Sequence, residues 1–238
     1  LLMLGDASVQ TGDYDQAESF FRAYGASSPA LTDSPEVLVR LGKVYLARGE
    51  RDKAVKQFTK LIAGNGNSEA ALAARMQLAK MGEVEAAGTG IQGLDARLDG
   101  AAAIYGWIAT QHPGSEKAPE ALAELAALQL ADGNHEDCLR SLGLFLANWP
   151  AHGRSGEMRT IGHTAFASMV ESAVTDEDFG NIMTVWSDHA HSLGEEGLAP
   201  RARIALAVAA MNDGSEDFAI HLAQSFFKQA APDQYAEL

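Results

Sequence analysis

Apolar and polar positions along the chain follow a helical pattern that breaks at short turns and groups the helices into pairs. Residues 1–24 predict one pair, with a turn at Gly12, and residues 35–60 predict the next, with a turn at Gly49. We expect both turn glycines to adopt the left-handed conformation that ends a helix, because glycine carries no Cβ penalty there. The pattern therefore predicts antiparallel pairs of helices.

The two pairs repeat with a constant offset of 37 residues. Five residues recur in this way: Leu4 as Leu41, Gly5 as Gly42, Gly12 as Gly49, Ala17 as Ala54 and Phe21 as Phe58. The same offset relates Ala101-x3-Tyr105-x7-Pro113 to Cys138-x3-Leu142-x7-Pro150. The small residues would let paired helices approach closely, and the phenylalanines would fill the space between neighbouring units. One pair alone cannot bury its apolar stripe, so the sequence predicts stacked units.

The order of these residues resembles the tetratricopeptide repeat. In the first unit the family's spacing is followed by Leu4-Gly5, Gly12, Ala17, Phe21 and Pro29. The resemblance implies an all-α fold, an α-solenoid of about five to six antiparallel helix pairs wound as a right-handed superhelix, with some pairs degenerate.

The ending His112-Pro113-Gly114-Ser115 is similar to the Pro-x-Ser endings of cell-envelope members of the family, such as outer-membrane assembly lipoproteins and Tol-Pal partners. This similarity implies a bacterial protein of the periplasm or cell envelope. The cytoplasm stays the alternative, because the single cysteine, Cys138, permits no internal disulfide.

We expect one continuous solenoid in three segments: residues 1–94, residues 95–154, and more degenerate helical repeats in residues 155–238. The stretch from Gly82 to Gly133 exceeds one period, and its excess lies near a glycine-rich loop at residues 88–93. The register between residues 82 and 99 is therefore open. Further on, Thr175-Asp176-Glu177-Asp178 replaces the turn glycine and predicts a helix start.

Composition narrows the classes of function. Of the 238 residues, 43 are alanine, the best helix former and a poor strand residue. The net charge of −14 at pH 7 argues against a nucleic-acid partner, and no run of 18 apolar residues predicts a membrane span. Because the chain opens at Leu1 inside a helical pattern, we expect it to be a piece of a longer protein.

Two motifs could indicate ligand or metal binding, and for each a structural explanation is favoured. The glycines of residues 88–93 have the spacing of a dinucleotide fingerprint but lack the preceding strand, so a loop between repeats is favoured. His135 and Cys138 share a helix face, but no CxxC or HExxH motif completes a metal site, and core packing is favoured. Glu136 and Asp137 would also raise the pKa of the thiol. The sequence predicts no enzyme activity, no cofactor and no metal.

In the family, the first helix of each unit lines a concave groove. Carried over to this sequence, the resemblance implies a partner-binding groove at Asp6, Val9, Gln10, Glu36, Val39, Arg40, Lys43, Leu46, Leu72, Met76, Lys80, Glu120, Glu124 and Ala127. Mixed apolar and charged positions are typical of a groove that takes an extended or helical peptide. Arg40, Lys43 and Lys80 would suit an acidic peptide or a carboxylate terminus, with solvated surface charge as the alternative.

The leading prediction is a protein–protein interaction scaffold that binds a protein or peptide partner in this groove, with no covalent step. The alternative is a structural or assembly module that stacks through its terminal faces on another subunit or on the missing part of its own chain. A third hypothesis is an accessory domain of an enzyme whose catalytic part lies elsewhere.

Overall fold

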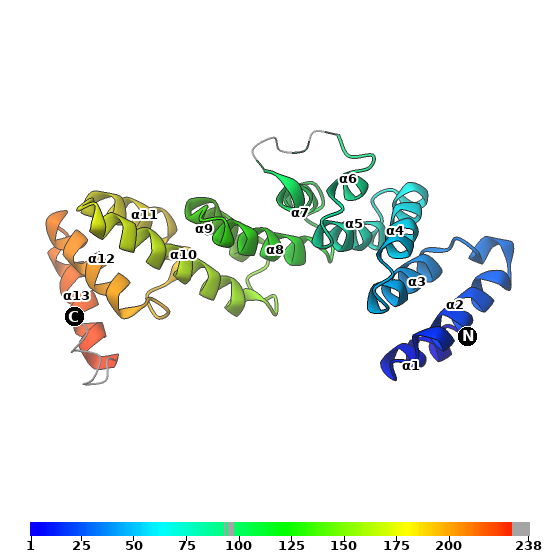
Figure 1. Cartoon of the computed structure of the whole chain (residues 1–238). Coiled ribbons are helices and arrows are strands. Elements are labelled where there is room, and N and C mark those ends of the chain that lie inside the picture. Colours follow the sequence, from blue (N-terminus) through cyan, green and yellow to red (C-terminus); the bar gives the residue numbers. More distant parts are fainter. Residues whose placement is uncertain (93, 95–97, 230–238) are drawn as a thin grey trace. The chain divides into compact units, whose positions relative to one another are not determined.

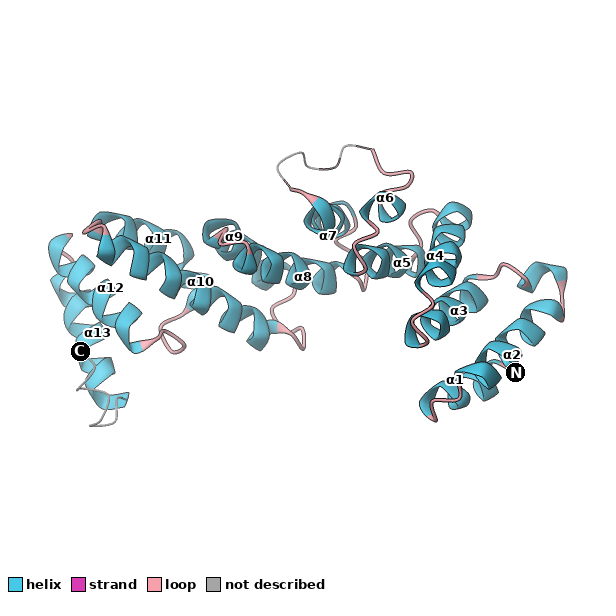
Figure 2. Cartoon of the chain, viewed as in Figure 1, coloured by secondary structure: helices cyan, strands magenta, loops and turns pink. Residues whose placement is uncertain are grey.

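The computed structural model describes residues 1–92, 94 and 98–229, and every regular element within these ranges is a helix (Figures 1 and 2). This confirms the predicted all-α class. None of these helices is long and apolar enough to cross a lipid bilayer. In chain order the elements are α1 (Leu2–Gln10), α2 (Tyr14–Ala26), the 3₁₀ helix η1 (Pro29–Leu31), α3 (Pro35–Ala47), α4 (Arg51–Asn65), α5 (Glu69–Lys80), α6 (Val84–Ala87), α7 (Gly100–Gln111), α8 (Ala118–Ala131), α9 (His135–Asn148), α10 (Ser155–Thr175), α11 (Phe179–Leu193), α12 (Pro200–Asn212) and α13 (Glu216–Gln229).

The chain divides into two compact units, unit 1 (residues 1–121) and unit 2 (residues 122–238), and the division falls within α8 rather than at residue 94 or 154. In unit 1, each of the helices from α1 to α4 packs on the helix that follows it. In unit 2, each of the helices from α9 to α12 does the same. Consecutive helices thus bury one another's apolar stripes, as stacked repeats require.

The turns that join paired helices share one backbone conformation. Their glycines have φ between +74° and +82°, which confirms the prediction for the first two: Gly12, Gly49, Gly82, Gly133 and Gly214. In the turn before α11, Glu177 has a φ of 55°. The predicted helix start is displaced: Thr175 ends α10, and α11 begins only at Phe179, with no acid in its first turn. The backbone N of Asn181 donates to the Asp178 carboxylate at 3.2 Å, so Asp178 is the N-cap of α11.

In the first two pairs, a phenylalanine of the second helix fills the space over a glycine of the first. A Cβ atom at Gly42 would lie 2.5 Å from the ring of Phe58, and one at Gly5 would overlap the ring of Phe21. Both rings are fully buried. Glycine is required at these two positions because the ring occupies the place of any side chain.

The third first helix, α5, departs from this arrangement at Arg75. This residue precedes the turn glycine Gly82 by seven positions, the spacing that separates the paired glycine from the turn in the first two units. Arg75 is buried, and the helix that follows the turn, α6, has only four residues. Both α6 and the longer α7 pack on α5 (Figure 1). The excess length predicted near residues 88–93 therefore comprises α6 and the segment that leads to α7.

Candidate protein-interaction site

Eight of the predicted groove residues lie on two first helices of unit 1. We call this surface the α1–α3 face, and it comprises Asp6, Val9, Gln10, Glu36, Val39, Arg40, Lys43 and Leu46. Gln10, Glu36 and Lys43 are exposed, and the other five are half-buried. Residues three and four apart share one side of a helix, so each helix contributes a stripe of these side chains.

An ion pair joins the two helices of the α1–α3 face. Arg40 Nε donates to Asp6 Oδ1 at 2.8 Å, and Arg40 Nη2 donates to Asp6 Oδ2 at 3.1 Å. The guanidinium carbon lies 6.0 Å from the centre of the Phe21 ring. The hydrogen bonds to Asp6 raise the pKa of Arg40 above its usual value, against the lowering effect of partial burial. Arg40 is therefore a charged link between repeats.

Because Arg40 is paired with Asp6, the three predicted basic residues differ in how accessible their charge is to a partner. Arg40 is held by Asp6 and offers a partner little of its charge. Lys43 is exposed, and it forms no ion pair with any residue that the structure describes. Lys80 is exposed at the last position of α5. On the α1–α3 face, Lys43 is thus the cation that a partner can reach.

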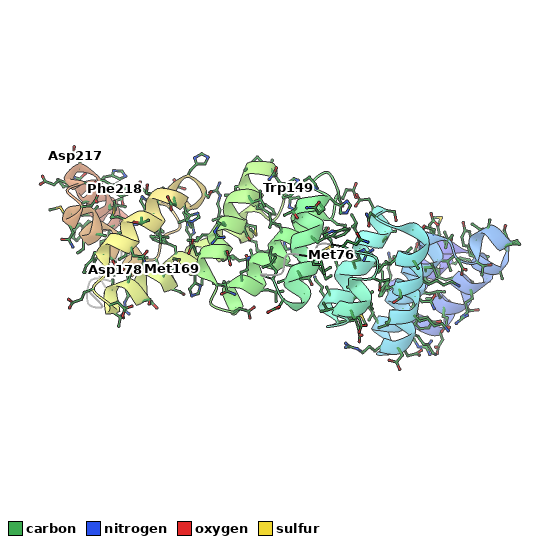
Figure 3. All side chains as sticks on the ribbon, turned by 90° about the horizontal axis from the view of Figure 1, so that it is seen from above. Met76, Trp149, Met169, Asp178, Asp217 and Phe218 are labelled. Atoms are coloured by element: carbon green, nitrogen blue, oxygen red, sulfur yellow. The ribbon has the colours of Figure 1, made fainter. Side chains whose placement is uncertain are left out.

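Two predicted groove residues on α5 belong to the interior of unit 1. Leu72 is 1% exposed and Met76 is 4% exposed (Met76 is labelled in Figure 3). Helix α5 packs against α4, α6 and α7, so few of its sides reach solvent. This corrects the placement of both residues in an open groove, and its cause is the altered packing around Arg75.

The last three predicted groove residues lie on α8, on either side of the division between the units. In unit 1, Lys117 Nζ donates to Glu120 at 3.0 Å. In unit 2, Arg154 Nη1 donates to Glu124 at 3.3 Å. Ala127 is exposed. Both carboxylates are engaged within their own unit, so they stabilise local packing.

The lone cysteine lies in the interior of unit 2. Cys138 is fully buried, and this burial raises the pKa of its thiol to about 11. A thiol with this pKa is protonated near neutral pH and is a poor nucleophile or metal ligand. Within the described residues, no group of three His, Cys, Asp or Glu side chains could hold a metal ion.

The glycine-rich motif follows helix α6 rather than a strand, and its last glycine, Gly93, lies outside the described residues. Its first part is anchored from α5, because Arg75 Nη1 donates to the carbonyl oxygens of Ala87 and Thr89, the latter at 2.8 Å. Burial lowers the pKa of Arg75. This arginine thus stabilises the chain where the second helix of the repeat is cut short.

Unit 2 also contains an apolar groove between α12 and α13, which is not among the predicted site residues. We call it the α12–α13 groove; its volume is about 450 Å³, and eleven residues line it: Arg203, Ile204, Ala207, Val208, Met211, Ala219, Ile220, Leu222, Ala223, Phe226 and Phe227. Val208, Met211 and Ile220 are 42%, 53% and 52% exposed. One signal for the groove is present in the sequence, because Ala223 stands at the position of the space-filling phenylalanine.

Comparison with known proteins supports the resemblance. Models of the tetratricopeptide repeat match residues 9–78 and residues 119–143. A search of curated proteins found no match. Among solved structures, the chain is similar to the crystal structure of a tetratricopeptide repeat protein from Parabacteroides merdae ATCC 43184. The two are 13% identical with a TM-score of 0.50, and the match covers 98% of this chain and 93% of that chain.

At 13% identity this similarity shows the fold alone, an all-α solenoid of helical repeats. The two segments matched by family models contain the turn glycines Gly12, Gly49 and Gly133, whose shared conformation is described above. The model matches thus place tetratricopeptide-like repeats in residues 9–78 and 119–143, and the fold is that of a helical-repeat solenoid.

Proposed function

We propose that the chain is a protein-interaction scaffold that holds a protein or peptide partner on the α1–α3 face. Tetratricopeptide repeats generally mediate protein–protein interaction, and their fold is typically a non-enzymatic scaffold. The observation that carries the proposal is the bidentate pair of Asp6 with Arg40. It joins the first helices of two successive units into one surface that needs no ordering when a partner binds.

The chemistry of the face supports a partner segment with an acidic group between apolar side chains. Lys43 is exposed, and Val39 and Leu46 lie about one turn before and after it, each half-buried. A carboxylate placed near Lys43 would form a charge-assisted hydrogen bond, while the flanking positions would cover apolar surface. Glu36 at the start of α3 would disfavour acidic groups at that end, which sets the direction of the segment.

Because Arg40 is paired with Asp6, the α1–α3 face is better tested by a substitution at Lys43 than at Arg40. Arg40→Glu would place two carboxylates against each other and separate the repeats, so a loss of binding would have two explanations. Lys43→Glu reverses an accessible charge and leaves the Asp6–Arg40 pair intact. Lys56→Glu on α4 is the matched control, because Lys56 is also exposed and lies on a second helix.

The experiment places a photo-crosslinking residue at Gln10, Glu36 or Lys56, which are all exposed, and exposes each protein to extract of the source cell. We expect one protein to crosslink from Gln10 and Glu36 but not from Lys56. That protein, once purified, is expected to bind the Lys43→Glu variant about tenfold more weakly than the parent, a loss of about 1.4 kcal/mol. Equal crosslinking from Lys56, or unchanged affinity for Lys43→Glu, would show that the α1–α3 face is the wrong surface.

A periplasmic or cell-envelope location stays a prediction from residues 112–115, and the structure gives this ending a local role. The Ser115 hydroxyl donates to Glu69 at 2.8 Å and accepts from the backbone N of Lys117 at 2.9 Å. The serine therefore helps to begin α8 and to fasten it to α5. Fractionation of the source cell, with detection of the chain by antibody, tests the location directly.

A further inference from the structure

The last turn of α4 carries an asparagine directly before a glycine, and its side chains anchor it weakly. Leu61 and Ile62 are 0% and 3% exposed, and they are the last buried residues of this helix. After them, Ala63 and Gly64 are exposed, and Asn65 is half-buried. The end of α4 is therefore held chiefly by hydrogen bonds rather than by burial of apolar surface.

Two hydrogen bonds close this turn. The backbone N of Gly66 donates to the carbonyl oxygen of Ile62 at 3.1 Å, and Asn65 Nδ2 donates to the carbonyl oxygen of Leu61 at 3.0 Å. Both Gly64 and Asn65 are poor helix formers, and Gly66 ends the helix with a φ of +57°. Because burial does not oppose it, local opening of this turn costs less free energy than unfolding of the chain.

Opening of the turn releases two groups that can react with each other. The backbone N of Gly66 can then approach Cγ of Asn65, because glycine has no Cβ atom to obstruct it. The nitrogen gives its proton to solvent and bonds to Cγ, while the bond from Cγ to Nδ2 breaks and the amino group takes up a proton and leaves as ammonia. Water then opens the cyclic imide at either of its two carbonyl carbons. The product is aspartate, or isoaspartate, in which the backbone runs through Cγ, and nothing is oxidised or reduced.

We propose that Asn65 is a site of spontaneous deamidation and that opening of the last turn of α4 sets the rate. The carboxylate formed has no hydrogen to donate, so the bond to the carbonyl oxygen of Leu61 is lost. It also places a negative charge at the C-terminal end of a helix, where the helix dipole disfavours it. The modified chain is therefore expected to lose the last turn of α4. Asn65 lies outside the α1–α3 face, so this inference goes beyond the function proposed above.

A second asparagine provides a matched comparison within the chain. Asn148 is the last residue of α9, and its Nδ2 donates to the carbonyl oxygen of Leu144, four positions earlier, at 2.8 Å. It thus shares with Asn65 both its place in the helix and its hydrogen bond, but Trp149 follows it instead of a glycine. The side chain of Trp149 hinders the approach of its own backbone N to Cγ. We therefore expect Asn148 to stay an amide while Asn65 reacts.

The test incubates the full chain in mildly alkaline buffer and follows both asparagines by mass spectrometry of proteolytic peptides. The amide of Asn65 is expected to convert to an acid at least about tenfold faster than that of Asn148. Isoaspartate at position 65, identified by peptide fragmentation, distinguishes the imide route from direct hydrolysis of the amide. Equal rates at the two asparagines, or a product that contains aspartate without isoaspartate, would overturn the proposed reaction.

The variant Gly64→Ala tests whether opening of the turn sets the rate. No atom lies within 4 Å of a Cβ atom placed at Gly64, so alanine fits there and favours the helix. Deamidation of Asn65 is expected to slow about fivefold, the ratio that corresponds to the helix preference of alanine over glycine. Gly156→Ala is the matched control, because Gly156 is also exposed, with equally open space, in the distant helix α10. An unchanged rate in Gly64→Ala, or equal slowing in Gly156→Ala, would separate the reaction from the turn and contradict the proposal.

The structural consequence is measured by hydrogen exchange. The Asn65→Asp variant carries one of the two products, and the backbone N–H of Gly66 is expected to exchange faster in this variant than in the parent. The same N–H should exchange more slowly in Gly64→Ala, because the turn opens less often. Exchange that is unchanged in Asn65→Asp would show that the new carboxylate leaves the end of α4 intact, which the proposal does not allow. Circular dichroism confirms that each variant is folded.

Discussion

The first helix pair, α1–α2, and the last, α12–α13, share their turn glycine and their buried alanine but differ at the position that fills the pair. Phe21 is fully buried in the first pair, whereas Ala223 lines an open groove in the last. The first pair also presents Asp6 to the next helix, where the last presents Val208. The shared residues fix the hairpin of each pair, and the differing ones decide what can lie against it.

The α8–α9 pair shows a third solution to the same packing problem. Ala126 stands at the position of Gly5 and Leu142 at that of Phe21, and both are fully buried. Compared with the first pair, α8 gains one methyl group and α9 carries a smaller side chain, and Leu142 reaches Gly162 of α10. Exchanges that keep the total side-chain volume are the kind that interiors tolerate best.

The largest expected effect follows from removing the phenylalanine that fills the space between the two helices of a pair. Phe58→Ala should lower the free energy of unfolding by about 3–5 kcal/mol, because the ring is buried and Gly42 offers nothing to refill the space. Urea unfolding followed by circular dichroism measures the loss. Lys56→Ala on the exposed side of α4 is the control and should stay within about 0.5 kcal/mol of the parent. A loss below about 1 kcal/mol for Phe58→Ala would mean that the pair closes without its phenylalanine.

The second prediction concerns variants that give the α3–α4 pair the residues found at the corresponding positions of α8–α9, alanine at position 42 and leucine at position 58. Gly42→Ala alone should destabilise by about 1–3 kcal/mol, because the added methyl meets the ring of Phe58. The double variant Gly42→Ala/Phe58→Leu should lose less than the sum of the two single changes, by at least about 0.5 kcal/mol. The same unfolding assay completes this double-mutant cycle. Additive losses would show that the two positions do not share one volume.

The sequence predicted what depends on local pattern. The helix pairs and the left-handed turns at Gly12 and Gly49 follow from spacing and backbone preference, and the structure confirms them. The helix start predicted at residues 175–178 lies a few residues too early, because Thr175 still belongs to α10 and α11 begins at Phe179. The end of α4 was less well predicted, because the helix continues past Lys60 and through Gly64 to Asn65, and Gly66 is the residue with positive φ that ends it.

The candidate site depends on contacts that local pattern does not contain. Asp6 and Arg40 are 34 positions apart, and nothing in either helix alone shows that they meet. Leu72 and Met76 were expected in a groove, but their burial follows from α7, which packs on α5 after a long insertion. The α12–α13 groove could have been predicted, because Ala223 stands at the position that Phe21 and Phe58 occupy in the first two pairs.

The third prediction concerns how stability depends on pH. The first pair carries the carboxylate of Glu18 where the last pair carries Ile220, so only the first pair should make a pH-dependent contribution at this position. Burial tends to raise the pKa of Glu18, but hydrogen bonds from Arg22 and Tyr45 prevail and lower it below its usual 4.5. Its stabilising effect is therefore present above pH 4.5 and is lost as the pH falls through the lowered value. Between pH 7 and pH 3, the parent should lose about 1 kcal/mol more in unfolding free energy than Glu18→Gln does. Urea unfolding at both pH values measures this, and Asp132→Asn, which changes an exposed carboxylate, should follow the parent.

The smallest expected effect concerns the ion pair that defines the α1–α3 face. The side chains of Arg40 and Asp6 are 30% and 45% exposed, so solvent screens their attraction and limits its contribution to stability. A double-mutant cycle with Arg40→Ala and Asp6→Ala should give a coupling of about 0.3–1 kcal/mol in urea unfolding. Raising the ionic strength from about 0.1 M to about 1 M should reduce that coupling, because the Debye length falls from about 10 Å to about 3 Å.

The cycle also distinguishes a link between repeats from a pair that merely meets at the surface. The pair of Arg140 with Glu136 lies within one turn of α9, with side chains 55% and 69% exposed, and it serves as the matched comparison. Its coupling should be smaller, because it holds no second helix in place. If both cycles gave the same coupling, Asp6 and Arg40 would add nothing to stacking. The α1–α3 face would then owe its shape to Phe21 and its apolar neighbours alone.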